Sequence, residues 1–401
     1  MRPDLPAELE LLVAAGRLSL DRSRRTAPIA TTAAVWDASV HAAQRHGMTA
    51  WLAEALRQCS PVPDAVRTQL ATTRRTQAAL ALKGIADVAA IVTLLRGAGV
   101  ETVNIKGPLY ARWLYGDAGV RRFADVDLVI TRNQRAQAIE ALRVDGYRIA
   151  GGLSEANARV VYAGVGSWPL LHPTRTPIDL HWMLQAPRFG TPFTSEALLR
   201  DSSETMAAGT AVRIPSPTHA AVLALVHAAK HLWASLELLL SIAHLMRRDD
   251  VDWARVRGLI TTGDGWTGAQ AGLLLSSDLF ECELPPALRG MPRPRSVERL
   301  QSAARTFLSV PDVDDMARGP EFRAHHAALD SWPGRLRYTA WRVLAPTPLE
   351  AAWCPLPGWL SPLYVVVRPV RLTLAGLRGV LTRIPALRAR RRAPIVRDGS
   401  V

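Results

Sequence analysis

Hydrophobic residues recur every three or four positions through the first hundred residues of the chain, and this spacing predicts amphipathic helices. Two such segments, residues 35–58 and 64–99, are separated by the proline-containing stretch CSPVP. We expect about three helices here, the last of them ending near Gly97 and Gly99. Residues 1–98 are therefore interpreted as a helical N-terminal region.

The pattern changes to mixed helix and strand over residues 99–210. The apolar run VETVNI predicts a short strand, and the proline after the next turn predicts a helix that begins at Pro108. A strand is expected at DVDLVI (125–130) and a helix at 133–146, with Asn133 as its N-cap. The segments SWPLLH and PIDLHWML flank PTRT as a predicted antiparallel hairpin. This middle third is typical of an α/β core.

Helical rhythm returns over residues 211–345, and the last segment, 346–401, is marked by proline, tryptophan and arginine. The most apolar stretch lies within 220–246, but it is interrupted by His227, Lys230, His231 and Glu237. It therefore predicts a buried helix or helix pair, and no transmembrane segment is expected. The N-terminus carries acids where a signal peptide has basic residues, so a cytoplasmic protein is expected. The predicted fold class is α+β, with a mixed-sheet core between helical flanks.

Composition narrows the class of protein. With 401 residues, of which 48% are hydrophobic and 21% charged, the chain has the balance of an ordinary globular protein and the length of two or three domains. The three cysteines, Cys59, Cys282 and Cys354, lie far apart and form no CxxC pair. Neither a zinc site nor a disulfide framework is indicated, and we interpret them as reduced, buried thiols.

The formal net charge is +14, and arginine carries almost all of the positive charge because the chain has only three lysines. Nine arginines and a single acid, Asp398, lie between Arg368 and the last residue. Two interpretations of this arginine-rich tail stay open. It is either a solvated basic segment or a site that docks RNA, DNA or anionic lipid.

Asp125 and Asp127 lie two residues apart inside the predicted strand DVDLVI. Alternate residues of a strand project from one face, so both carboxylates should face the same point. Two carboxylates this close repel one another unless a cation lies between them, and the pair therefore predicts a magnesium site. Asp179, within PIDLHWML, would complete a site for two Mg²⁺ ions if the hairpin brings it near. Such ions hold a nucleoside triphosphate (NTP) and stabilise the transferred phosphoryl group.

The turn at Lys106 and Gly107 predicts a phosphate-binding element upstream of the acids. Glycine allows the backbone to approach a phosphate closely, and Pro108 at the first helical position places a positive helix N-terminus beside the lysine. Arg121, four residues before Asp125, would reach the same triphosphate. The two ends of this segment are thus expected to hold one metal-bound NTP.

Together these motifs resemble those of the uncharacterised bacterial nucleotidyltransferases of the polymerase-β-like superfamily. The resemblance rests on the order IKGPLYARWLYGD, VRRFADVDLVI, IDLHWML and HAAKHLW, and it runs from about residue 35 to residue 255. It implies a polymerase-β-like nucleotidyltransferase core with Mg²⁺ and an NTP donor. In that core the metal ligands would be Asp125, Asp127 and Asp179, and the triphosphate would lie at Lys106 and Gly107.

The chain departs from the superfamily pattern in two places. Lys-Gly-Pro replaces the usual Gly-Ser turn, so the serine that would bind phosphate is absent and Lys106 is the residue in a position to replace it. In the helix after HAAKHLW, Glu237 and Ser241 stand where relatives often carry Arg and Asp. The second departure concerns the nucleotide-binding role of that helix and leaves the metal site unchanged.

Three histidines have more than one interpretation. His181, two residues after Asp179, would either hydrogen-bond a carboxylate of the metal site or serve as a structural histidine. His227 and His231 are spaced i, i+4 on a predicted helix, which suits zinc, but no third ligand is in register. We expect them to pack with a neighbouring tryptophan, or one of them to line the substrate cleft with Lys230.

The function predicted from these features is a metal-dependent nucleotidyltransferase that moves an NMP from an NTP to a hydroxyl acceptor and releases pyrophosphate. The acceptor would be a small molecule, a peptide or protein side chain, or an RNA end. The alternative is a catalytically idle nucleotidyltransferase fold that docks nucleic acid or anionic membrane through its basic tail. Three carboxylates favour the enzyme, because binding an anion alone does not need them.

Overall fold

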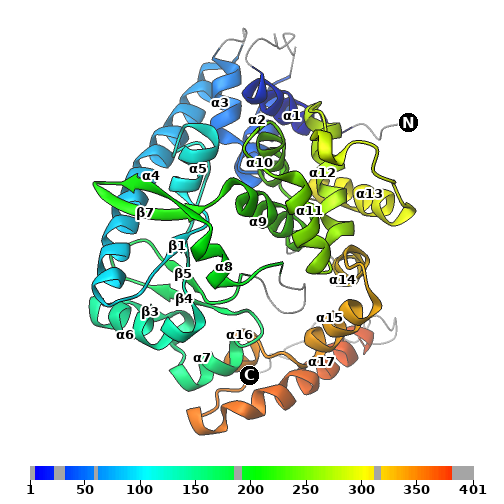
Figure 1. The fold of residues 1–401 in the computed structure, drawn as a ribbon. Coiled ribbons are helices and arrows are strands. Elements are labelled where there is room, and N and C mark those ends of the chain that lie inside the picture. The colour runs from blue at the N-terminus through cyan, green and yellow to red at the C-terminus, as the bar shows by residue number, and fades with distance from the viewer. Residues whose placement is uncertain (1–4, 22–31, 58–61, 185–191, 311–317, 382–401) are drawn as a thin grey trace, which may run out of the picture. The chain divides into compact units, whose positions relative to one another are not determined.

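The structure is a computed structural model, and the residues that it describes are 5–21, 32–57, 62–184, 192–310 and 318–381 (Figure 1). Cys59 and residues 382–401 lie outside this part, so the predictions about that thiol and about most of the arginine-rich tail concern residues that the structure does not describe. Of the other two cysteines, Cys282 is buried, as expected, and Cys354 is partly exposed.

Contacts divide the chain into two compact units. The core unit comprises residues 1–150 and 165–338, and the C-terminal unit comprises residues 151–164 and 339–401. The domain boundaries expected from the sequence, after residues 98, 210 and 345, stay predictions.

A mixed seven-stranded sheet lies in the core unit, with the strand order β3-β4-β5-β2-β1-β7-β6. The strands are β1 (Val103–Asn104), β2 (Val126–Val129), β3 (Arg148–Ile149), β4 (Ser167–Leu171), β5 (Ile178–His181), β6 (Ser202–Ala207) and β7 (Thr210–Pro215). β2 and β5 run parallel side by side, and β1 pairs antiparallel with β2 on the other edge of that strand. The sheet therefore places the end of β1 beside the acidic strand β2.

Helices precede and follow the sheet, and the architecture confirms the expected α+β fold with helical flanks. The helices before the sheet are α1 (Ala7–Leu20), α2 (Ala33–Arg45), α3 (Thr49–Leu56) and α4 (Asp64–Gly97). Those among the strands of the core unit are α5 (Pro108–Tyr115), α6 (Arg135–Asp145) and α8 (Ser195–Arg200). Those after the sheet are α9 (Pro217–Lys230), α10 (Leu236–Met246), α11 (Trp253–Thr262), α12 (Trp266–Phe280), α13 (Arg295–Ser309), α14 (Arg318–Ala328) and α15 (Trp332–Leu344).

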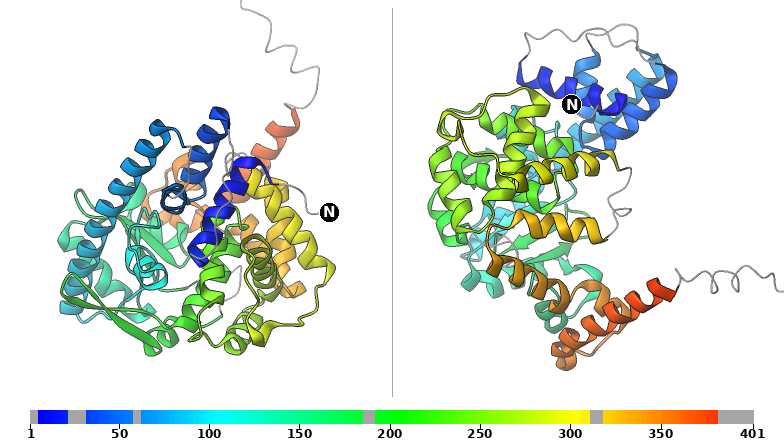
Figure 2. Two further views of the ribbon diagram at one scale, coloured as in Figure 1. Left: turned by 90° about the horizontal axis from the view of Figure 1, so that it is seen from above. Right: turned by 90° about the vertical axis from the view of Figure 1, so that its right-hand side faces the viewer.

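Helices far apart in the sequence share one hydrophobic core in the core unit. α1 packs against α10 and α12, and α10 packs against α12 and α9. Figure 2 shows the blue first helix beside the green and yellow helices. Leu12, Trp233 and Leu240 are among the side chains that this core removes fully from water, and such apolar burial is the main favourable term in folding. The apolar stretch 220–246 thus forms the helix pair α9 and α10, as predicted.

The 34-residue helix α4 supports the sheet. Its buried residues recur at the helical period and include Ile85, Val88, Val92 and Leu95, and it contacts α5, α6, β6 and β7. Among the described residues, α4 is also the one helix long and apolar enough to cross a membrane by length and composition alone, with 44% of its most apolar window buried. A buried core helix passes the same test. The expectation of no transmembrane segment stays a prediction.

Local structure differs from the sequence-based expectation in three places. About three helices were expected before residue 98, and the described residues form four, because Gly47 adopts a φ of +69° that separates α2 from α3 within the segment 35–58. The helix expected from Asn133 begins at Arg135, after a 3-10 turn, and Gln134 is its N-cap. The hairpin of β6 and β7 was not predicted at all. By contrast, β4 and β5 pair antiparallel and confirm the predicted hairpin.

The C-terminal unit is small and mostly helical. It contains α7 (Glu155–Val161), α16 (Pro348–Trp353), a 3-10 helix (Gly358–Leu363) and α17 (Tyr364–Leu381). The Asn157 side-chain amide donates to the Leu356 carbonyl at 2.9 Å, and the Leu356 N–H donates to the Tyr364 hydroxyl, also at 2.9 Å. These hydrogen bonds tie α7 to the start of α17.

Candidate metal and nucleotide site

Asp127 on β2 and Asp179 on β5 are direct neighbours across the two parallel strands, with their Cα atoms in register. Side chains in register on adjacent strands project from the same face, so two carboxylates that would repel one another are held side by side. Val126 and Leu128, on either side of Asp127, are fully buried, while Asp127 itself is 5% exposed. Burial of these apolar neighbours on the opposite face explains why a strand forms around a buried acid.

The imidazole of His181 bridges the two carboxylates. Its Nε2 lies 3.0 Å from Asp127 Oδ1 and 3.1 Å from Asp179 Oδ2. Burial alone would lower the pKa of His181, but the charges and hydrogen bonds of the two aspartates outweigh it and raise the pKa to about 9. The ring is therefore a cation at neutral pH. Of the two roles considered for His181, the structure shows the contact with the carboxylates.

Lys106 contacts the same oxygen of Asp127 as His181 does, with Nζ 3.1 Å from Oδ1. The strand before it is fixed to β2, because the Asn104 amide and the Ile105 N–H both donate to the Asp127 carbonyl at 3.1 Å. Burial would raise the pKa of Asp127, yet Lys106 and His181 together hold it well below its usual range. Asp127 is therefore ionised between two cations.

The turn after Lys106 confirms the predicted local structure. Gly107 has φ +85° and ψ −158°, a conformation that is nearly restricted to glycine, and α5 begins at Pro108 as expected. A Cβ added to Gly107 would lie 3.9 Å from the Asp125 carbonyl oxygen, so the turn passes close to the Asp-x-Asp segment. The structure thus brings a lysine and a helix N-terminus beside the acids, an arrangement that suits a phosphate group.

Asp125 occupies the rim of this cluster. It precedes β2 rather than lying within it, and it is exposed. Partial burial of its carboxyl and the charge of Asp127 raise the pKa of Asp125. Among the described residues, one group has three metal-ligating side chains within 4.8 Å of one another, and it consists of Asp127, Asp179 and His181. The structure therefore brings two of the three predicted acids together and leaves Asp125 outside that group.

The side chains present fit a divalent cation. Asp179 Oδ1 is buried and has no hydrogen-bond partner among the described residues, although the Ser167 hydroxyl is close enough to the carboxyl to help lower its pKa. Carboxylate oxygens suit hard cations such as Mg²⁺, and an imidazole nitrogen is a common ligand of transition metals. A cation between Asp127 and Asp179 would compete with Lys106 and His181 for the same oxygens. These donor atoms therefore fit Mg²⁺ and divalent transition metals alike.

A family model described as "Uncharacterised nucleotidyltransferase" matches residues 32–281, more than half of the chain. The chain belongs to this nucleotidyltransferase family. The match contains all seven strands and the helices from α2 to α12, and with them every residue of the acidic cluster. No curated protein and no solved structure matches the chain.

In this member of the family, Arg121 lies in an ion pair with Glu237, with Nε 2.9 Å from Oε1, and both side chains are largely buried. Glu237 also accepts a hydrogen bond from the Ser241 hydroxyl at 2.9 Å, and that hydroxyl lies 2.5 Å from the Tyr115 hydroxyl. The two positions that depart from the superfamily pattern, Glu237 and Ser241, therefore form a network with Arg121 and the end of α5. A role for Arg121 at the triphosphate stays a prediction.

A pocket lies beside Lys106. It is lined mainly by apolar side chains of α5, α9 and α10, and its polar lining includes Arg121 and His227. Burial and the nearby charge of Lys106 lower the pKa of His227, so its ring is neutral. The rings of His227 and His231 lie 4.4 Å apart, and no group of three metal-ligating side chains among the described residues includes them. Of the expected roles for His227, lining a cleft agrees with this pocket.

Lys230, in contrast, lines a separate pocket with His325, whose Nε2 lies 2.9 Å from the Lys230 carbonyl oxygen. The sequence did not predict this contact. It also did not predict the hydrogen bond from the Asn104 side-chain amide to the Asp127 carbonyl. An asparagine inside the apolar run VETVNI, two residues before Lys106, was the signal that the sequence offered for Asn104. The contact between His325 and α9 had no local signal, because 95 residues separate its two partners.

Proposed function

We propose that this chain is a metal-dependent nucleotidyltransferase that transfers an NMP from an NTP to a hydroxyl acceptor and releases pyrophosphate. The observation that carries the proposal is the registered pair Asp127 and Asp179, with Lys106 and His181 about 3 Å from its oxygens. Membership of a nucleotidyltransferase family supports the same chemistry. Mg²⁺ as the ion, an NTP such as ATP as the donor and a cytoplasmic location complete the proposal.

The proposed roles follow from position. Asp127 and Asp179 hold the cation, with Asp125 at the rim as the third carboxylate. When bound, a divalent cation polarises phosphate oxygens and lowers the pKa of the acceptor hydroxyl. Lys106 has a flexible side chain that is 25% exposed, which allows it to turn from Asp127 to an oxygen of the triphosphate. Gly107 keeps the N-terminus of α5 open to that triphosphate.

In the proposed reaction the acceptor oxygen forms a bond to the α-phosphorus. The bond from that phosphorus to the bridging oxygen breaks, and pyrophosphate leaves with the electron pair. The hydroxyl proton passes to a carboxylate of the site or to solvent, so no dedicated protein base is required. The acceptor class stays open among small molecules, peptide or protein side chains and RNA ends.

Calorimetric titration of each of the four NTPs into the full-length protein, with and without Mg²⁺, tests the proposal. We expect binding that requires the ion, is lost in Asp127→Asn and in Asp179→Asn, and survives in the control Asp249→Asn, which changes an exposed acid. Turnover with a supplied acceptor should follow the same order. If Asp127→Asn folds normally and still binds and turns over like the parent protein, the metal site is wrongly assigned.

The alternative, a catalytically idle fold that docks a partner through its basic tail, is favoured by one observation. Lys106 and His181 already balance the charges of Asp127 and Asp179 in this structure. Deletion of the chain from Arg383 onward distinguishes the two. Turnover that survives the deletion favours the enzyme. Partner binding that needs the tail, with no NTP binding in the intact protein, favours the docking module.

A further inference from the structure

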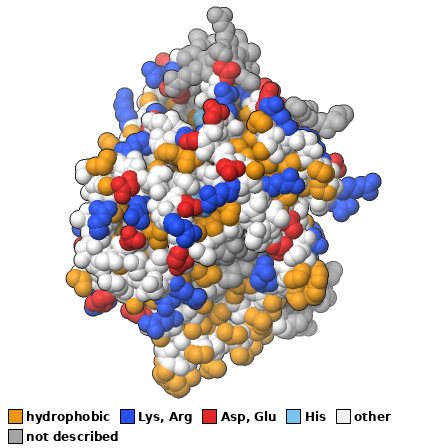
Figure 3. Space-filling model, in the orientation of Figure 1, with side chains coloured by type: hydrophobic (Ala, Val, Ile, Leu, Met, Phe, Trp, Pro, Cys, Tyr) orange, Lys and Arg blue, Asp and Glu red, His pale blue; other side chains and the backbone are white. Residues whose placement is uncertain are grey.

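The C-terminal unit exposes an apolar surface that its size does not explain. Ten large apolar side chains of residues 339–375 are exposed, against seven in the described part of the much longer core unit. Trp359 is the most exposed of them at 79%, followed by Val366 at 60% and Leu349 at 58%. Figure 3 shows hydrophobic side chains gathered over the segment that Figure 1 draws in orange. Contiguous surface of this kind marks a binding face rather than scattered exposure.

Helix α17 turns its charged face inward and its apolar face outward. Val366, Val370 and Leu374 recur at i, i+4 and i+8, so they form one stripe along the helix, and all three are exposed. At 100° per residue, Arg368 lies about 160° and Arg371 about 100° from the centre of this stripe, and their side chains are only 6% and 16% exposed. This is the reverse of the arrangement in a helix that packs its apolar stripe on a protein core.

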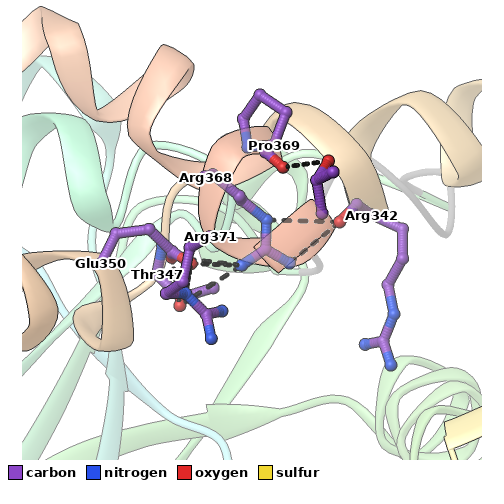
Figure 4. A network of polar contacts seen from close by, with 7 residues as sticks. Arg342, Thr347, Glu350, Arg368, Pro369 and Arg371 are labelled. Atoms are coloured by element: carbon purple, nitrogen blue, oxygen red, sulfur yellow. Dashed lines mark hydrogen bonds and ion pairs between the residues drawn. The ribbon is translucent and has the colours of Figure 1, made fainter. Parts of the chain in front are cut away.

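Glu350 holds α17 in this orientation (Figure 4). Its carboxylate is fully buried and lies 3.1 Å from Arg368 Nη1 and 2.5 Å from Arg371 Nε. Arg368 also donates through Nε and Nη2 to the Arg342 carbonyl, at 3.2 and 2.9 Å. Rotating the helix to bury its stripe would break these contacts and leave Glu350 as an unpaired buried charge. The contacts of Glu350, Arg368 and Arg371 therefore keep the apolar stripe of α17 facing outward.

The charge and aromatic content of the same segment identify the occupant. No acidic residue occurs between Glu350 and Asp398, and seven arginines follow the inward-facing Arg371 in that segment. Two exposed tryptophans, Trp353 and Trp359, precede α17. An aliphatic stripe with neighbouring arginines and tryptophans is the composition of a helix that lies at the interface of an anionic membrane.

Other partners match this surface less well. RNA or DNA would use the arginines but gains nothing from burying an aliphatic stripe. A second copy of the chain would bury the stripe but would bring two arginine-rich segments together without acids to neutralise them. We propose that the C-terminal unit docks on the surface of an anionic lipid bilayer, with the exposed stripe of α17 inserted at the boundary of the headgroups and acyl chains.

Flotation of the full-length protein with vesicles tests this docking. The vesicles contain phosphatidylcholine alone or a mixture with phosphatidylglycerol. We expect binding to the anionic vesicles, weakened by salt, and a blue shift of tryptophan fluorescence on binding. The variant Val366→Asp/Val370→Asp should bind these vesicles at least roughly tenfold more weakly than the parent protein, because it removes two inserted side chains and adds two negative charges.

A matched control introduces the same two negative charges outside the C-terminal unit. Leu82→Asp/Val144→Asp also replaces two exposed apolar side chains, both in the core unit, and should bind as the parent protein does. Circular dichroism verifies that each variant is folded, and Val366→Leu/Val370→Leu should retain binding. Absence of parent binding to anionic vesicles overturns the proposal, as does equal binding by the Asp variant.

Two further outcomes would identify a different occupant and equally overturn the proposal. In the first, light scattering shows that the parent is a dimer and that the Val366→Asp/Val370→Asp variant is a monomer, with no vesicle binding by either. In the second, a single-stranded RNA binds with an affinity that the stripe variant leaves unchanged, while vesicles do not bind at all.

Discussion

Replacing Glu350 by alanine should destabilise the C-terminal unit by several kcal/mol. The Glu350 carboxylate accepts hydrogen bonds from Arg368 at 3.1 Å, from Arg371 at 2.5 Å and from the Thr347 N–H at 2.7 Å. Glu350 is fully buried and Arg368 is nearly so. Water therefore cannot replace the lost partner of either arginine without opening the unit.

The magnitude follows from these contacts. Removing one partner of a buried ion pair costs about 3–5 kcal/mol, and loss of the capping box between Thr347 and Glu350 adds about 1 kcal/mol. Glu350→Gln keeps the shape and one oxygen acceptor, so the expected cost is smaller, about 1.5–3 kcal/mol. Glu155→Ala, in the same unit, removes an exposed pair with Arg159 at 3.3 Å and should cost less than about 1 kcal/mol.

Hydrogen exchange of the backbone amides of α16 and α17, measured in increasing urea, reports the opening free energy of this unit. The expected order of destabilisation is Glu350→Ala, then Glu350→Gln, then Glu155→Ala. Amides of β2 and β5 in the core unit serve as an internal reference in each sample. Equal protection of α17 in Glu350→Ala and Glu155→Ala would refute the reasoning, because it would mean that the buried contacts contribute no more than exposed ones.

Three further predictions concern the core unit. Gly107→Ala should cost about 1–3 kcal/mol, because its φ of +85° and ψ of −158° strain any residue with a Cβ; an unchanged urea midpoint would contradict this. Glu237→Ala leaves Arg121 buried without its ion-pair partner and should destabilise the fold by about 3–5 kcal/mol. The double variant Glu237→Ala/Arg121→Met should recover part of that loss, measured by thermal unfolding. An equal loss in the single and double variants would argue against the ion pair. Burial and then the charge of Arg45 lower the pKa of His46 from 6.5 to about 4. The unfolded chain therefore binds more protons between these values, and stability that is present above pH 6.5 falls by roughly 3 kcal/mol as the pH drops to 4, at 1.36 kcal/mol per pH unit. Urea unfolding across that range measures it, and a flat profile would contradict it.

The parts of the site that the sequence predicted are those with local causes. Period-two alternation places Asp127 on one face of its strand, whatever lies beside that strand. The Lys106, Gly107 and Pro108 turn depends on the conformational preferences of glycine and proline, which act within a few residues. Both features could therefore be derived before the fold was known, and the structure agrees with them.

The parts that the sequence did not predict depend on partners distant in the chain. Asp179 was expected near the acidic pair through its hairpin, but its direct neighbour is β2, a parallel pairing that no local pattern reports. Arg121 was expected at a triphosphate, yet its ion-pair partner is Glu237, which lies 116 positions later. The orientation of α17 depends on Glu350 in the same way. Composition indicated an arginine-rich segment, but only the contacts show which face of α17 points outward.

Buried acids occur in both units, and the way their hydrogen bonds are completed separates a structural role from a chemical one. Glu350 contacts two arginines and takes part in a capping box, and these partners are largely buried with it. Its carboxylate is therefore fully paired within the protein. At the sheet, Asp179 keeps one buried oxygen without a hydrogen-bond partner in the described part of the chain, and Lys106 remains 25% exposed beside Asp127. A buried polar atom left unsatisfied costs free energy that a stable fold has no need to retain, unless a ligand supplies the missing contact. That incomplete network, rather than burial of acids as such, is the physical reason to expect a cation and a triphosphate at Asp127 and Asp179.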